Sequence, residues 1–140
     1  MPAFAGETGE APLTYTLRRA VIPDAAAGTD YTTAVGTMPF AGSVSAVRFI
    51  PDASVSGATA TATTLTVTNK TQTLNPAALA FITGTDLTVG VPKVITLSGV
   101  AANLVVAASD VLQLVKTHAG AGTALLGGVL EIDIVRSDIL

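Results

Sequence analysis

Short runs rich in Val, Ile and Thr alternate with turn-forming residues along the chain, and this pattern constrains the fold most strongly. Eight runs fit it: 14–22, 32–38, 43–50, 59–70, 78–83, 92–97, 110–118 and 128–136. β-Branched residues favour pleated, half-buried sheet surfaces. Many short strands with recurring turns are typical of a sandwich or barrel. The sequence therefore predicts an all-β fold of eight strands, arranged as a sandwich or a barrel.

Two segments carry weak helical signals. Asn75 is a suitable N-cap for a helix that begins at Pro76, and residues 101–109 fit a single helical turn. Both segments are too short to predict a structural helix.

The chain divides into a short arm and one domain. Its 140 residues suit a single domain. Residues 1–12 are mostly small and include two prolines and two glycines, so we predict an extended N-terminal arm over 1–12 and a single β-sandwich domain over 13–140. The first residues lack the basic and apolar regions of a signal peptide, and no apolar stretch approaches the ~18–20 residues of a membrane span. We therefore expect neither.

The last run gives the clearest assignment of faces. Aliphatic residues alternate there with Glu131 and Asp133, and side chains two residues apart share one face of a strand. We expect both acids to point outwards. We expect the aliphatic residues of the last two runs to be buried: Leu112, Leu114, Leu130, Ile132 and Ile134.

The first run is less regular. Leu17 and Val21 share a face with Arg19, which requires either a β-bulge or a covered outer face. If the first and last strands are antiparallel neighbours, as they are in a jelly roll, Arg18 or Arg19 is predicted to lie beside Glu131 or Asp133.

The stretch from Lys116 to Asp133 holds the only histidine, His118, and several glycines. A phosphate-binding loop needs a Gly-rich turn that ends in Gly-Lys-Ser/Thr and opens a helix. Here the glycines end at Gly127-Gly128, Lys116 precedes them, and an alternating strand follows. We therefore interpret the stretch as a turn between two strands, with no cofactor site.

No catalytic or metal site is predicted. The chain has no cysteine, and one histidine cannot build a typical zinc site. Glu131 and Asp133 are a geometrically possible carboxylate pair, but alternating acids are the ordinary solvated face of a strand. The Gly-x-Ser-x-Gly motif of an activated serine is absent. We expect a protein that is not an enzyme.

Charged residues are scarce. Asp, Glu, Lys and Arg make up 12% of the chain, against about 25% in typical domains. The net charge of −3 argues against nucleic acid as a partner. So few charges suit a concentrated free monomer poorly, so we expect much of the surface to be covered by copies of the chain or by a larger assembly. The alternative is a monomer kept soluble by its threonines.

The closing stretch SDVLQLVKTHAGAGTALLGGVLEIDIV resembles the last strand pair of small jelly-roll proteins that decorate (cement) tailed-phage capsids. Those proteins have a Gly/Ser-Asp opening, an apolar strand, an AG-x-G loop and a final strand that starts with two glycines. Their loop often reads Leu-Pro-Gly-Gly, whereas this chain has Leu125-Leu126-Gly127-Gly128. The likeness covers about a fifth of the chain.

The resemblance implies a jelly-roll-like fold, an antiparallel eight-stranded sandwich, in a structural virion protein that is not an enzyme. It implies a homotrimer on the outer capsid surface that binds the major capsid protein lattice and cements neighbouring capsomers with an N-terminal arm. We assign a capsid-binding role to the following residues of that arm: Pro2, Phe4, Glu7, Glu10 and Pro12.

The rival interpretation is a binding module, such as a phage fibre tip or a carbohydrate-recognition domain. Such a module needs an aromatic or polar pocket in its loops. The chain offers Tyr15, Tyr31 and Phe40 for that purpose.

Overall fold

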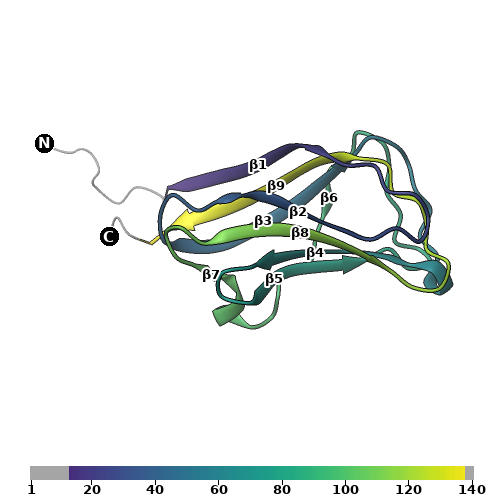
Figure 1. The fold of residues 1–140 in the computed structure, drawn as a ribbon. Coiled ribbons are helices and arrows are strands. Elements are labelled where there is room, and N and C mark those ends of the chain that lie inside the picture. Colours follow the sequence, from purple (N-terminus) through teal and green to yellow (C-terminus); the bar gives the residue numbers. More distant parts are fainter. Residues whose placement is uncertain (1–12, 138–140) are drawn as a thin grey trace, which may run out of the picture.

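The computed structural model describes residues 13–137, which form two antiparallel β-sheets packed face to face (Figure 1). One sheet contains β1 (Thr14–Ile22), β9 (Gly128–Arg136), β3 (Gly42–Pro51), β6 (Lys93–Val94) and β7 (Val105–Val106). The other contains β2 (Tyr31–Thr37), β8 (Val111–His118), β4 (Thr63–Asn69) and β5 (Leu74–Ala80). Two short 3₁₀ turns, η1 (Thr59–Thr61) and η2 (Ala101–Leu104), lie outside the sheets.

The strand order is that of a jelly roll. Strands from the two ends of the chain pair with each other, β1 with β9 and β2 with β8, and then β3 with β6 and β4 with β5. The pairing of β3 with β9 joins two of these strand pairs into one sheet, and the pairing of β4 with β8 joins the other two into the second sheet. This arrangement is the double Greek key of a jelly roll, so the predicted all-β sandwich is confirmed.

Four details of the strands differ from the prediction. A ninth strand, β7, pairs with the start of β3. The run 59–70 begins with η1, and the run 92–97 contributes only the two residues of β6. The predicted run 78–83 lies earlier in the chain, as β5, and this strand includes Asn75 and Pro76, where the sequence carried a weak helical signal. Because β5 is an edge strand, Pro76 fits there without the N–H that an inner strand would require.

The core lies between the two sheets, where the predicted faces are confirmed. The five aliphatic residues predicted to be buried all have an exposed fraction of 0%: Leu112, Leu114, Leu130, Ile132 and Ile134. Phe49 and Leu65, from the next strands, are equally buried. Burial of such side chains contributes roughly 1.5–3 kcal/mol each relative to exposure.

A β-bulge resolves the irregular pattern of β1. The register with β9 shifts between Arg19 and Ile22, so that Leu17 and Ile22 are buried while Val21 is 72% exposed. Arg19 then donates from Nη1 to the Ala34 carbonyl oxygen over 3.1 Å. The arginine therefore links β1 to β2, the edge strand of the opposite sheet.

Candidate functional site

The glycine-rich segment 119–127 is a turn between β8 and β9, as predicted. The Gly127 N–H donates to Asp24 Oδ1 over 2.6 Å. A Cβ atom at position 127 would lie 2.1 Å from the carbonyl oxygen of Ile22. Glycine is therefore required at 127 because the turn packs closely against the end of β1.

Lys116 and His118, the basic residues before this turn, are both engaged in structural contacts. The Lys116 side chain is fully buried, and its ammonium donates to the Thr29 carbonyl oxygen. Burial lowers the pKa of Lys116, and the Asp30 carboxylate opposes that shift. His118 Nδ1 lies 2.6 Å from Asp30 Oδ1. The two side chains therefore connect the end of β8 to residues 29–30, which precede β2.

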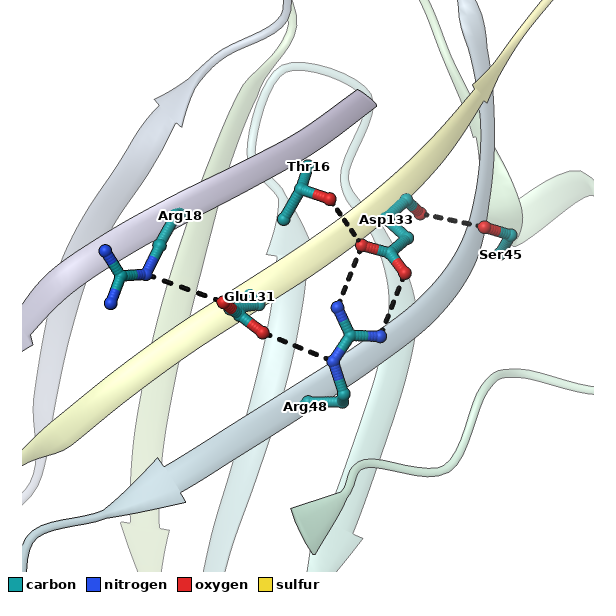
Figure 2. Close-up of polar contacts among 6 residues, drawn as sticks. All are labelled: Thr16, Arg18, Ser45, Arg48, Glu131 and Asp133. Atoms are coloured by element: carbon teal, nitrogen blue, oxygen red, sulfur yellow. Dashed lines mark hydrogen bonds and ion pairs between the residues drawn. The ribbon is translucent and has the colours of Figure 1, made fainter. Parts of the chain in front are cut away.

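Charged side chains from three strands meet on the outer face of the five-stranded sheet (Figure 2). Arg48 binds Asp133 in a fork, with the Nη1–Oδ2 and Nη2–Oδ1 distances both 2.9 Å. Arg48 Nε lies 3.3 Å from one oxygen of Glu131, and Arg18 Nε lies 3.5 Å from the other. Thr16 donates to Asp133 over 2.7 Å. The predicted ion pair between the first and last strands is thereby confirmed.

The charges of this cluster compensate one another. Hydrogen bonds from Arg48 lower the pKa of Asp133 against the opposing effect of burial, and Thr16 adds to the lowering. The same bond to Asp133 raises the pKa of Arg48. Bidentate arginine–carboxylate pairs are strong and geometrically specific. The cluster therefore stabilises the register of β1, β9 and β3. Both of its carboxylates form ion pairs with arginine side chains.

Arg48 is the charged member of the cluster that the sequence did not indicate. Its neighbours Val47 and Phe49 are buried, so alternation alone places Arg48 outside. The β3–β9 register, in which Arg48 is opposite Glu131, joins positions that are far apart in the chain. Alternation within a single strand does not predict this register, so the contact of Arg48 with Glu131 could not be predicted from the sequence.

A second polar cluster, also not predicted, surrounds the buried carboxylate of Asp110. It accepts hydrogen bonds from Asn69 Nδ2 and from the Ala107 N–H, both over 2.8 Å, and from Gln72 Nε2. Burial raises the pKa of Asp110, but these hydrogen bonds outweigh it and the net shift is downward. The cluster ties the β4–β5 turn to the segment that precedes β8.

The outer face of the four-stranded sheet carries no charged residue. Its outward positions alternate with the buried ones along each strand, and they lie side by side in the strand registers. We call these residues the neutral face: Thr32, Ala34, Thr37, Thr64, Thr66, Thr68, Ala78, Ala80, Val111, Gln113, Val115 and Thr117. All of these are Thr, Ala or Val except Gln113, and the exposed Asn75 of β5 is also uncharged.

The three aromatic residues of the rival interpretation do not share one platform. The Tyr31 ring packs against the core, and burial raises the Tyr31 pKa to about 12. Tyr15 and Phe40 form an edge-to-face pair with ring centroids 5.2 Å apart. Arg136 lies over the Phe40 ring at 4.3 Å. The pair Tyr15–Phe40 remains partly accessible at one end of the sandwich.

The arm residues assigned to capsid binding, Pro2 to Pro12, lie outside the described part of the chain. Within residues 13–137, no group of three or more His, Cys, Asp or Glu side chains is placed to hold a metal ion. No helix in the same range is long and apolar enough to cross a membrane.

Comparisons with known proteins give one structural likeness. No protein-family model matches the chain, and no curated protein matches it. A chain in the structure of infectious bursal disease virus, Gx strain, is similar in structure, with 11% sequence identity and a TM-score of 0.44. The match covers 100% of this chain but only 38% of that chain. No functional conclusion follows from a likeness of this degree.

Proposed function

We propose that the chain is a structural virion protein. In this proposal it decorates the outer surface of a capsid as a homotrimer and cements the shell. The observation that carries the proposal is the neutral face: a full sheet surface of Thr, Ala and Val is suited to being covered in an assembly. Exposed surfaces ordinarily carry about 25–35% charged residues, so a sheet face without any is suited to contact with another protein surface.

The jelly-roll order is compatible with this role, since capsid and lectin domains both use the fold. The fold alone does not select a function. The direction toward a capsid comes from the closing stretch that resembles decoration proteins, which forms β8, the turn and β9.

Decoration would stabilise the shell by mass action. A protein that binds only the assembled capsid stabilises it by RT ln(1 + [L]/Kd) per site. A trimer would make several such contacts at once, and this raises the overall affinity without any new type of contact. The N-terminal arm would add a further attachment on each copy.

A binding module, such as a fibre tip or a carbohydrate-recognition domain, is the second candidate. The partly accessible Tyr15–Phe40 pair is the observation in its favour, because aromatic rings can stack on ligands. The contact of Arg136 with the Phe40 ring covers part of that surface.

Two binding experiments separate these candidates. Cosedimentation with empty, undecorated capsids should remove the protein from the supernatant up to a fixed ratio of protein to capsid. A glycan array should stay blank. Saturable glycan binding, together with no capsid binding, would replace the decoration proposal with the binding module.

A further inference from the structure

We propose that residues 4–11 of the N-terminal arm add a strand to the free edge of β1, antiparallel to it. The docking site is the row of main-chain groups along that edge, and its occupant is the arm of the same chain. The inference goes beyond the proposed function, because it concerns the free chain and holds whether or not the chain binds a capsid.

β1 lies at the edge of the five-stranded sheet, and in the described part of the chain it pairs only with β9 (Figure 1). The Arg136 N–H donates to the Leu13 carbonyl oxygen over 3.0 Å. Main-chain groups alternate in direction along an antiparallel strand, so those of Tyr15 and Leu17 also face β9. The N–H and C=O groups of the alternate residues therefore point along the free edge: Thr14, Thr16 and Arg18.

The other sheet edges are protected in ways that natural proteins use against the addition of a strand. The short strands β6 and β7 cover the two ends of β3, and the segment 96–98 hydrogen-bonds to β5. A register shift between Ala34 and Gly36 interrupts β2, and Arg19 donates to a carbonyl oxygen of that strand. β1 keeps a regular register over 14–19, so among the described strands it offers the longest unprotected edge.

The charges of the arm complement those of β1. β1 carries Arg18 and Arg19 and no acidic residue, whereas the arm carries Glu7 and Glu10 and no basic residue. Opposite charges on neighbouring strands stabilise their pairing, and like charges destabilise it. Two β1 strands would therefore repel each other, whereas the arm is attracted. The Arg18 side chain is 55% exposed and contacts Glu131 through Nε, so its guanidinium can reach a second carboxylate.

The short connection between the arm and β1 sets the register. Residues 12–13 form the turn, because proline is favoured at the first inner position of a tight turn. Ala11 then lies opposite Thr14, and a residue before proline favours the extended backbone of a strand. Counting along both strands from this pair places Glu7 opposite Arg18. The acid of the arm and the exposed arginine of β1 therefore meet on the outer face of the sheet.

The same register brings the aromatic residue of the arm to an exposed apolar side chain. Phe4 reaches the far end of β1, where Val21 is 72% exposed. Contact between these two side chains removes apolar surface from water, which favours docking. Because the turn joins the arm directly to β1, docking is intramolecular and proceeds at a high effective concentration.

Amide hydrogen exchange, followed residue by residue by NMR, tests whether the edge is occupied. The Thr16 and Arg18 amides should exchange more slowly in the full chain than in a variant without residues 2–12, by about tenfold or more, because a hydrogen-bonded amide exchanges only when its strand opens. The Tyr15 and Leu17 amides face β9, so they are internal controls and should change much less. The protection should be the same at low and at high protein concentration.

Two proline variants test the register in the full-length chain. In the proposed register the Gly9 N–H points toward β1 and the Thr8 N–H points away from it. Proline has no N–H, and an edge strand accepts it only where that group faces solvent. Gly9→Pro should therefore remove the protection of Thr16 and Arg18, whereas the matched control Thr8→Pro should keep it. Gly9→Pro also replaces the truncated chain as the reference if the latter does not fold.

Three results would overturn the inference. The first is equal exchange of Thr16 and Arg18 in the full and truncated chains. The second is a Gly9→Pro chain that keeps full protection. The third is protection that disappears on dilution, because this would assign the edge to the arm of a second copy.

Discussion

Arg48 and Asp133 join β3 to β9 through two parallel N–O contacts of 2.9 Å. Asp133→Asn should lower the free energy of unfolding by about 1.5–3 kcal/mol, the range for hydrogen bonds to charged groups. Arg18→Ala is the control, because the Arg18 side chain is 55% exposed and makes one contact with Glu131. Its loss should cost only about 0.2–1 kcal/mol. Urea denaturation measures both, and equal losses would contradict this ranking.

Acid should weaken the fold through Asp133 and Asp110. Both carboxyls have a lowered pKa in the folded protein. Their contribution to stability is therefore present above the unfolded pKa of about 3.9 and is lost as the pH falls through the folded value. The urea concentration at the midpoint of unfolding should therefore decrease when the pH is lowered below about 4. Asp133→Asn should lose less stability than the wild type over that range, and a parallel decline in both proteins would speak against this role.

The face assignment of β9 predicts a large contrast between adjacent residues. Ile132→Ala should lower the free energy of unfolding by roughly 2–5 kcal/mol, because it leaves a cavity at a fully buried position. Glu131→Ala removes partly exposed ion pairs and should cost about 1 kcal/mol or less. Thermal and chemical denaturation report both, and similar losses would refute the assignment.

The Tyr31 hydroxyl offers a stabilising substitution. In the described part of the chain it is the one buried side-chain polar group without a hydrogen-bond partner. An unsatisfied buried group costs about 1–3 kcal/mol, so Tyr31→Phe should raise the melting temperature or leave it unchanged. A loss of more than about 1 kcal/mol would mean that the hydroxyl has a partner in the folded protein.

The N-terminal arm should matter for attachment and not for folding. Deleting residues 2–12 leaves both sheets intact and removes Phe4, the arm's large aromatic side chain. We expect unchanged folding and oligomeric state, with capsid attachment weakened at least tenfold, about 1.4 kcal/mol per site. A titration of empty capsids measures this. If the truncated protein decorates capsids at the same concentration as the full-length protein, the arm has no role in capsid attachment.

The sequence predicted those features that depend on local alternation. The buried residues of β8 and β9 and the outward acids follow from a period of two, and the bulge in β1 follows from a conflict in that period. Features that depend on distant strands were missed. The place of Arg48 beside Glu131 depends on the β3–β9 register, and the neutral face appears only when four strands lie side by side. The start of β5 at Leu74 was missed because Asn75-Pro76 is typical of a helix start, whereas the edge position in the sheet accepts a proline.

The mass of the unmodified protein in solution tests the central claim most directly, since the account requires that copies cover one another. Light scattering at micromolar concentration should give about three times the chain mass of 14.0 kDa. The value should not depend on salt, because uncharged surfaces make the contact. A mass of one chain across that concentration range would contradict the account.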